Sequence, residues 1–361
     1  MEIKQLGIEE LKIISNNFKQ ELQDAQAGKK TSLAFIIHEL SPSPIVKDGE
    51  IFQTLVIGGT IGIIATLKKN NNAIQILDKK EKKLSFKTGE EFLDYVNQEL
   101  QENIKTLALN FAYPIKPVFE KGKLDGTLLT VTKEGGFHGL IGKQIGREIE
   151  KYILAKRNIE IRVAVANDTV CLLTSGLSQF KQDGLAGGIV GTGLNFAFFL
   201  DKVKLVNLES ANFDKFPQTE LGRKVDEVSS RPGKSLFEKE TAGAYLYQGF
   251  KFALKENDLD YPNIASTEEL DRTSRANIPQ VSRIAQSLLK KSAQLVACQI
   301  TGITLFKKQN MIFNMEGSLF WKGNEYKETV AETVRQLAPQ YKIDFVEIED
   351  SAILGAAKLI S

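Results

Sequence analysis

The sequence predicts an α/β protein with mixed sheets, built as two related lobes around a central cleft. Two glycine-rich turns, each set between apolar strands, occur within residues 54–66 and 187–200. Segments with amphipathic helical periodicity lie between and after these two strand pairs. A chain of 361 residues is long enough for two lobes that each have their own hydrophobic core.

Helices and strands alternate along the N-terminal half of the chain. Apolar residues at helical spacing predict helices over residues 8–28, 90–105 and 139–156. Residues 107–113 form a continuous apolar run that is closed by Pro114, which predicts a short buried strand. The alternating segment 159–166 predicts a further strand, and it ends directly before Asn167.

The C-terminal half contains more helix. Helical patterns begin at Lys239 and recur over residues 281–304 and 348–360. From this order we assign residues 50–166, together with the C-terminal helix 351–361, to a small lobe. Residues 1–49 and 167–350 are assigned to a large lobe.

Composition excludes several functional classes. The net charge is only +2 and no block of like charges stands out, so neither nucleic acid nor a membrane surface is expected as a partner. Cys171 and Cys298 lie in apolar segments and are expected in the core. With only His38 and His138, histidine metal sites and Ser-His-Asp catalysis are poorly supplied. Without a signal pattern or a spanning apolar run, we expect a cytoplasmic protein. No motif indicates its oligomeric state.

Two turns carry groups that can bind phosphate. They read Gly58-Gly59-Thr60 and Gly191-Thr192-Gly193. Such turns expose backbone N–H groups, and each adds a threonine hydroxyl. Between them, Asp168 follows a strand, where a carboxylate could take a proton from an acceptor hydroxyl. An Asn-Asp pair is by itself more typical of a turn or helix cap, but its place between two such turns indicates a nucleotide-dependent phosphotransferase.

Seven motifs occur in the order found in one known family. They are Phe111-Ala-Tyr-Pro114, Val131-Thr132-Lys133 with Phe137, Asn167-Asp168-Thr169, Gly191-Thr192-Gly193 with Asn195, Val206-Asn207 with Glu209, Pro232-Gly233 with Glu238, and Gly317-Ser318. On these residues, which span nearly the whole chain, the protein is identified as a member of the hexokinase family. That family belongs to the actin-like ATPase superfamily, so the resemblance implies a two-lobed, ribonuclease H-like fold.

The resemblance also implies an activity and a set of site residues. The activity is ATP-dependent phosphorylation of a hexose, glucose by default, at the 6-hydroxyl, with Mg²⁺ accompanying the nucleotide. Asp168 is implied as general base, and Lys133 as a catalytic residue near sugar and phosphate. The implied sugar-binding residues are Thr132, Lys133, Asn167, Asp168, Asn195, Glu209 and Glu238. The implied nucleotide-binding residues are Gly58, Gly59, Thr60, Gly191, Thr192, Gly193, Gly317 and Ser318. No direct protein ligand of a metal is assigned.

The first phosphate turn departs from the family pattern Asp-x-Gly-Gly-Thr-Asn-x-Arg. Val56, Ile61 and Ile63 occupy the positions of the Asp, Asn and Arg. These changes remove charge where phosphoryl transfer uses it. Ala112 replaces a sugar-facing serine, and residues 351–353 are bulkier than the family's adenosine-side turn. The sugar side of the motif set is therefore better preserved than the nucleotide side.

This asymmetry leaves two hypotheses open. The first is an active hexokinase, which the presence of Asp168 and Lys133 favours. The second is a homologue with weak or no catalysis that binds a sugar as a sensor or regulator, which Val56 favours. A nucleotide-hydrolysing chaperone or filament of the same superfamily is a weaker third reading, because it would not use the acids Glu209 and Glu238.

Overall fold

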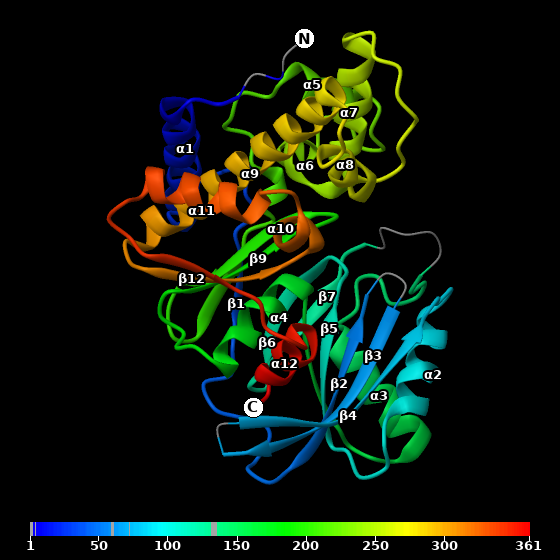
Figure 1. The fold of residues 1–361 in the computed structure, drawn as a ribbon. Helices are drawn as coiled ribbons and strands as arrows, with labels where there is room; N and C mark the ends of the chain where they lie inside the picture. Colours follow the sequence, from blue (N-terminus) through cyan, green and yellow to red (C-terminus); the bar gives the residue numbers. More distant parts are fainter. Residues whose placement is uncertain (1–2, 4, 59–60, 72, 131–135) are drawn as a thin grey trace. The chain divides into compact units, whose positions relative to one another are not determined.

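The computed structural model describes residues 3, 5–58, 61–71, 73–130 and 136–361 (Figure 1). The chain forms two compact units. Unit 1 comprises Met1–Phe35, Gly188–Phe196 and Leu208–Glu347, and unit 2 comprises Ile36–Gly187, Ala197–Asn207 and Ile348–Ser361. The predicted α/β class with mixed sheets is confirmed. The lobe boundaries given by the sequence stay a prediction.

Unit 2 contains a five-stranded mixed sheet. Its strands in spatial order are β4 (Ala73–Lys83), β3 (Ile61–Asn70), β2 (Ile51–Ile57), β5 (Thr106–Phe111) and β8 (Arg162–Ala166). Strands β2, β3 and β4 are antiparallel neighbours, whereas β2, β5 and β8 run parallel. The carboxyl ends of the three parallel strands therefore meet at one edge of the sheet, where open α/β sheets commonly bind ligands.

Four helices cover this sheet (Figure 1). They are α2 (Gly89–Glu99), α3 (Ile145–Arg157), α4 (Asp168–Ser175) and α12 (Ser351–Lys358). Helices α2 and α3 pack on one face, where Phe92 and Ile149 join Leu55, Leu109 and Val165 in the core of the unit. Helices α4 and α12 pack on each other and contact the opposite face of the sheet. Side chains reach both faces because they alternate along each strand.

The approach of α4 to α12 depends on a glycine. A Cβ atom at Gly355 would lie 1.8 Å from the carbonyl oxygen of Cys171, so no other residue fits there without a shift of one helix. Thr174 donates its hydroxyl to the Gly355 carbonyl at 2.9 Å. This contact fixes α4, the helix that begins at Asp168. Cys171 and Cys298 are both fully buried, as predicted.

A second mixed sheet has six strands. In spatial order they are β1 (Ile36–Glu39), β11 (Lys204–Asn207), β10 (Leu194–Phe199), β9 (Leu185–Val190), β12 (Met311–Glu316) and β13 (Ile343–Val346). Strand β11 is antiparallel to β1 and β10, and β12 is parallel to β13. A separate hairpin pairs β6 (Ile115–Glu120) with β7 (Lys123–Leu128). The two predicted glycine hairpins are the pairs β2–β3 and β9–β10.

The helices of unit 1 are packed with α9 at their centre. They are α1 (Ile8–Gln26), α5 (Glu220–Glu227), α6 (Leu236–Thr241), α7 (Gly243–Glu256), α8 (Thr267–Ser274), α9 (Pro279–Lys307), α10 (Ser318–Lys322) and α11 (Tyr326–Leu337). Helices α1, α6, α7, α8 and α11 all contact α9. Residues around the whole circumference of α9 are buried, as expected for a helix at the centre of a bundle.

Helix boundaries differ most from the predicted ones in unit 2. The helix predicted over residues 90–105 ends at Glu99, because Leu100 is extended with ψ of 119°. The helix predicted from residue 139 begins only at Ile145. Gly139 and Gly142 have positive φ values of 91° and 78°, which are incompatible with a right-handed helix.

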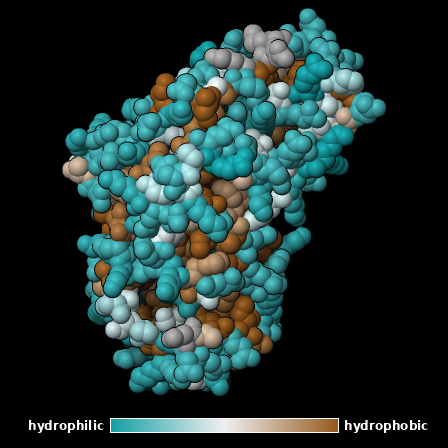
Figure 2. All heavy atoms as spheres, turned by 60° about the vertical axis from the view of Figure 1, so that its left-hand side comes forward, coloured by the Kyte–Doolittle hydropathy of each residue, from teal (hydrophilic) through white to brown (hydrophobic). Residues whose placement is uncertain are grey.

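Within the described ranges, no helix is long and apolar enough to cross a membrane. The face drawn in Figure 2 is largely hydrophilic, with apolar side chains in smaller groups between the polar ones.

Candidate active site

Asn167 and Asp168 stand at the junction of β8 and α4 in unit 2. Asn167 is the N-cap of α4, and its side-chain oxygen accepts a hydrogen bond from the N–H of Val170 at 3.0 Å. Asp168 is the first residue of the helix. Its carboxylate accepts from the N–H of Thr169 at 2.7 Å and from the Thr169 hydroxyl at 3.2 Å. The cap is therefore Asn167, and Asp168 is not needed for that role.

The surroundings of Asp168 suit a proton acceptor. The residue is exposed to solvent, yet the protein atoms around it desolvate its carboxylate and raise its pKa. The hydrogen bonds from Thr169 oppose this rise only in part. A carboxylate with a raised pKa is a stronger base once it is ionised.

Asp168 and the first phosphate turn lie at the same edge of the sheet. Val56 pairs with Asn110, and Asn110 pairs with Ala166, so these residues form one row across β2, β5 and β8. The turn follows this row on β2, and Asp168 follows it on β8. Because neighbouring strands are about 5 Å apart, the two strand ends are separated by about 10 Å.

The first turn is described only in part. The N–H of Gly58 donates to the carbonyl of Ile61 at 3.0 Å, which closes the β2–β3 hairpin. Four predicted site residues lie outside the described residues: Gly59, Thr60, Thr132 and Lys133. Their roles stay predictions.

The second phosphate turn, in unit 1, is held by backbone hydrogen bonds. Gly191 donates its N–H to the carbonyl of Gly193 at 3.0 Å. From the start of α7, Gly243 donates to the carbonyl of Gly191 at 2.8 Å, and Ala244 donates to that of Thr192 at 3.0 Å. The turn carbonyls are thereby occupied by α7, and the side chain of Thr192 is left exposed.

Gly317 packs directly on this turn. It has a φ of 120°, and a Cβ atom there would lie 2.2 Å from the carbonyl oxygen of Val190. A Cβ at Gly191 would in turn lie 3.3 Å from the Gly317 Cα. Ser318, the next residue, begins α10 and is exposed. The structure thus brings the predicted nucleotide-binding segments 191–193 and 317–318 together.

Three predicted sugar-binding residues also lie together in unit 1. The side-chain oxygen of Asn195 accepts from the N–H groups of Phe196 at 2.8 Å and Ser210 at 3.2 Å. Its amide nitrogen donates to Glu209 at 3.5 Å. Glu238 accepts from the N–H of Leu194 at 3.3 Å. Two carboxylates and an amide therefore surround the end of the second turn.

Partial burial changes the pKa of Glu238. Desolvation raises the pKa of its half-buried carboxyl group, and the nearby charge of Glu209 raises it further. The Leu194 N–H bond and the charge of Arg231 oppose the rise. Partly desolvated carboxylates accept hydrogen bonds strongly, which suits recognition of sugar hydroxyls.

Comparison with family models decides the identity. Residues 3–177 match a model described as hexokinase, and residues 185–257 and 255–361 match a second model with that description. The chain belongs to the hexokinase family. It is therefore a hexose kinase, a phosphotransferase that acts on an alcohol group.

Individual hexokinases agree with this assignment. The hexokinase of Emericella nidulans is 27% identical over an alignment of 429 positions. The alignment covers 96% of this chain and 86% of the relative. Hexokinase-1 of Spinacia oleracea is 23% identical, and the match covers 97% of this chain and 86% of the relative. The fold matches a hexokinase from Schistosoma mansoni complexed with glucose, with a TM-score of 0.78 and 20% identity over 98% of this chain and 95% of the other. The predicted actin-like fold is confirmed.

The second turn of this hexokinase fits nucleotide phosphates. Hexokinases use ATP with Mg²⁺, and phosphate oxygens need a close approach to backbone amides. The close packing of Gly317 on Gly191 leaves no room for a Cβ atom at Gly317, and the hydroxyls of Thr192 and Ser318 lie at the surface beside it.

The first turn does not fit a magnesium ion in the family manner. Magnesium prefers carboxylate and water oxygens. Val56 has Ile63 directly opposite it, and the amide oxygen of its other neighbour, Asn110, is buried with no hydrogen-bond partner among the described residues. One buried amide does not replace a carboxylate. The described chain also offers no group of three His, Cys, Asp or Glu that could hold a metal ion.

Sequence reasoning missed two contributors to the site. Gly243 supports the second turn, and the run Ala242-Gly243-Ala244 after the Glu238 motif was the available signal. Asn110 was counted only as part of a buried strand. Nothing in its local sequence shows that it lies level with Val56, because that register comes from the sheet.

Proposed function

We propose that this hexokinase transfers the γ-phosphoryl group of ATP to the 6-hydroxyl of glucose, with Asp168 as the general base. The observation that carries the proposal is the position of Asp168. It begins α4 at the sheet edge where β2 also ends, and its carboxyl group has a raised pKa. Asn167 caps the helix, so Asp168 is not needed for capping. Asp168 takes the proton of the 6-hydroxyl while the oxygen of that hydroxyl attacks the phosphorus.

In this proposal the sugar is recognised by carboxylate and amide side chains. Glu209 and Glu238 accept hydrogen bonds from sugar hydroxyls, while Asn195 and Asn167 can both donate and accept. Thr132 and Lys133 complete the set, with the lysine charge next to the reacting groups. Glucose is the proposed substrate because the structurally similar hexokinase from Schistosoma mansoni is a glucose complex.

The nucleotide phosphates bind mainly to the second turn. The segments Gly191–Gly193 and Gly317–Ser318 supply backbone amides and hydroxyls, and Gly58 to Thr60 supply the smaller contribution from the first turn. A Mg²⁺ ion that accompanies the nucleotide would neutralise phosphate charge. Val56 would offer that ion no carboxylate.

The test combines binding with turnover. Glucose, mannose and fructose are titrated calorimetrically into the protein, and ADP release is then followed on the sugar that binds most tightly. For Asp168→Asn we expect kcat to fall by about 10² to 10⁴, the usual contribution of a general base, with a nearly unchanged sugar Kd. Asp78→Asn, at an exposed aspartate of β4, is the matched control and is expected to keep full activity.

Two results would contradict the proposal. Unchanged turnover in Asp168→Asn would remove the residue from the base role. Sugar binding without phosphoryl transfer from any nucleotide would support a sensor instead, a function that the apolar residues Val56 and Ile63 favour.

A further inference from the structure

Helix α6 carries Glu238 but cannot hold its own position. It has only six residues, far fewer than an isolated helix needs in water. Its N-cap residue, Ser235, has the left-handed φ of 50°, which a residue with a side chain adopts only when its surroundings enforce it. The position of Glu238 must therefore be set by what the neighbouring residues of α6 contact.

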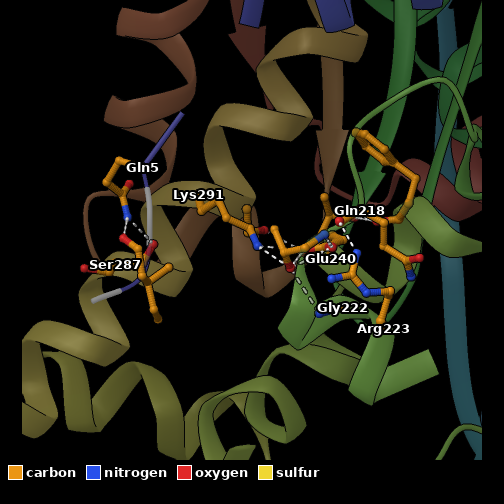
Figure 3. Close-up of polar contacts among 12 residues, drawn as sticks. Gln5, Gln218, Gly222, Arg223, Glu240, Ser287 and Lys291 are labelled. Atoms are coloured by element: carbon orange, nitrogen blue, oxygen red, sulfur yellow. Dashed lines mark hydrogen bonds and ion pairs between the residues drawn. The ribbon is translucent and has the colours of Figure 1, made fainter. Parts of the chain in front are cut away.

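Glu240, two residues after Glu238, is the most strongly fixed of these neighbours. It forms an ion pair with Lys291 of α9 at 2.6 Å, and the two side chains are only 2% and 3% exposed. Its oxygens also accept from the N–H of Thr219 at 2.7 Å and from the Thr219 hydroxyl at 2.8 Å. Figure 3 shows Lys291 extending from α9 toward this carboxylate.

The same carboxylate holds the start of α5. Thr219 is the N-cap of α5, and its hydroxyl oxygen also accepts from the N–H of Gly222 at 3.0 Å. A Cβ atom at Gly222 would lie 2.0 Å from the Glu240 oxygen, so a larger residue there would displace this carboxylate. Helices α5, α6 and α9 therefore meet at one buried carboxylate (Figure 3).

Residues on either side of Glu240 strengthen this junction. Lys239 forms an ion pair with Asp226 of α5. The carbonyl of Thr241 accepts from the hydroxyl of Ser292 on α9 at 2.8 Å. Three consecutive residues of α6 are thus bound to α5 or α9, and Glu238 directly precedes them.

We infer that Glu240 and Lys291 are positioning residues for hexose binding. Their ion pair fixes α6 on α9 and so keeps Glu238 against the second phosphate turn, where it contacts the Leu194 N–H. The inference rests on the proposed role of Glu238 in binding the sugar. Removing one partner leaves a buried charge without compensation, and α6 must then move to let water reach it.

The experiment measures glucose affinity calorimetrically, or that of the tightest-binding hexose of the panel. Lys291→Met is compared with the wild type at a temperature where circular dichroism shows both folded. We expect the sugar Kd to rise roughly tenfold, because a charged hydrogen-bond acceptor is displaced. Lys291→Arg keeps the charge and is expected to recover most of the affinity.

A double variant separates positioning from a general loss of stability. Lys291→Met with Glu240→Leu removes both charges, and such apolar replacements commonly restore stability. Positioning predicts that the sugar Kd stays raised, because the link from α9 to the α5 cap is still absent. If affinity recovers together with stability, the inference is wrong.

Lys123→Met is the matched control in unit 2. This lysine is 8% exposed and pairs with Glu150 at 3.0 Å and with the buried Asp125 at 3.6 Å, so its loss also leaves a buried acid without its partner. Among the described residues it pairs with no proposed site residue. We expect lower stability with an unchanged sugar Kd. An equal loss of sugar affinity in this variant would mean that any buried ion pair produces the effect, and it would overturn the inference.

Glu238→Gln distinguishes the inference from the proposed function. If this variant binds the sugar normally, the proposed role of Glu238 fails, and with it the basis for positioning. If Glu238→Gln weakens binding while Lys291→Met does not, the proposed function stands and only the positioning role is rejected.

Discussion

The two phosphate turns of this hexokinase are built differently. The turn of unit 1 is made from backbone: Gly243 and Ala244 bind its carbonyls, and Gly317 packs on it without a side chain. The turn of unit 2 has only apolar side chains at the three positions where its family carries charged or polar ones, among them Val56. One turn is fixed by backbone hydrogen bonds and close packing, while the other has no charged side chain at these positions.

The difference shows that the backbone of such a turn and its charged side chains can vary separately. Backbone amides are supplied by the fold itself, so they persist as long as the glycines that permit the close approach persist. Carboxylate and guanidinium groups depend on single side chains, and one substitution removes each. The predictions below test each turn by the kind of change to which it should be sensitive.

The largest effect is expected for Gly317→Ala. The new Cβ would meet the Val190 carbonyl at 2.2 Å with φ at 120°, so the second turn must shift. We expect the free energy of unfolding to fall by about 3 kcal/mol, as for an overpacked core site, and the ATP KM to rise. Urea denaturation and steady-state kinetics measure the two effects.

Gly122→Ala is the control for that substitution. Gly122 also has a positive φ, of 71°, but no described atom outside residues 121–123 lies within 4 Å of its Cβ position. Only the backbone cost of about 1 kcal/mol is expected, with an unchanged ATP KM. If both variants behave alike, close packing is not what maintains the second turn.

Val56→Asp, in the first turn, is expected to raise the turnover rate. It restores a carboxylate beside Asn110 at the sheet edge, where a hydrated Mg²⁺ on the nucleotide can be bound. We expect kcat to rise about tenfold and the Mg²⁺ concentration for half-maximal rate to fall, both measured by ADP release. Val56→Asn, similar in shape but neutral, should give no gain. A loss of activity in Val56→Asp would indicate that the apolar turn is adapted to a different donor.

The pH dependence of turnover and of sugar binding tests the roles of Asp168 and Glu238. Desolvation by the surrounding protein atoms raises the pKa of Asp168, and the base must be ionised to act. The value of kcat/KM should therefore fall as the pH drops through a midpoint above the ordinary aspartate value. At that midpoint the rate is halved. Glu238 also has a raised pKa, so sugar affinity should weaken at low pH. Calorimetry on Asp168→Asn isolates the second effect, and a midpoint at the ordinary value would contradict the desolvation of Asp168.

The sequence predicted what depends on local pattern. The helices α1 and α9 follow from apolar periodicity, and the two hairpins follow from their glycines. The short strands β1, β11 and β13 were not predicted, because four residues show too little periodicity to distinguish a strand from a loop.

The site was predictable only where motifs carry it. The proximity of Asn195, Glu209 and Glu238 was implied by family motifs far apart in sequence. The Glu240–Lys291 pair has no such motif: its members are 51 residues apart, and each reads locally as a surface charge on an amphipathic helix. Long-range pairing of this kind is decided by helix packing, which a single sequence does not display.

The smallest effect is expected for Lys79→Met, on β4 beside the start of α12. Lys79 pairs with Asp350, the N-cap residue of α12, at 2.8 Å, but the lysine side chain is 50% exposed and water screens the pair. If the second turn carries most of the nucleotide binding, the ATP KM should change less than about twofold. Lys80→Met, at the neighbouring exposed lysine, is the control. A much larger KM change in Lys79→Met alone would mean that the start of α12 still binds the nucleotide, so that unit 2 has lost charge only at its first turn.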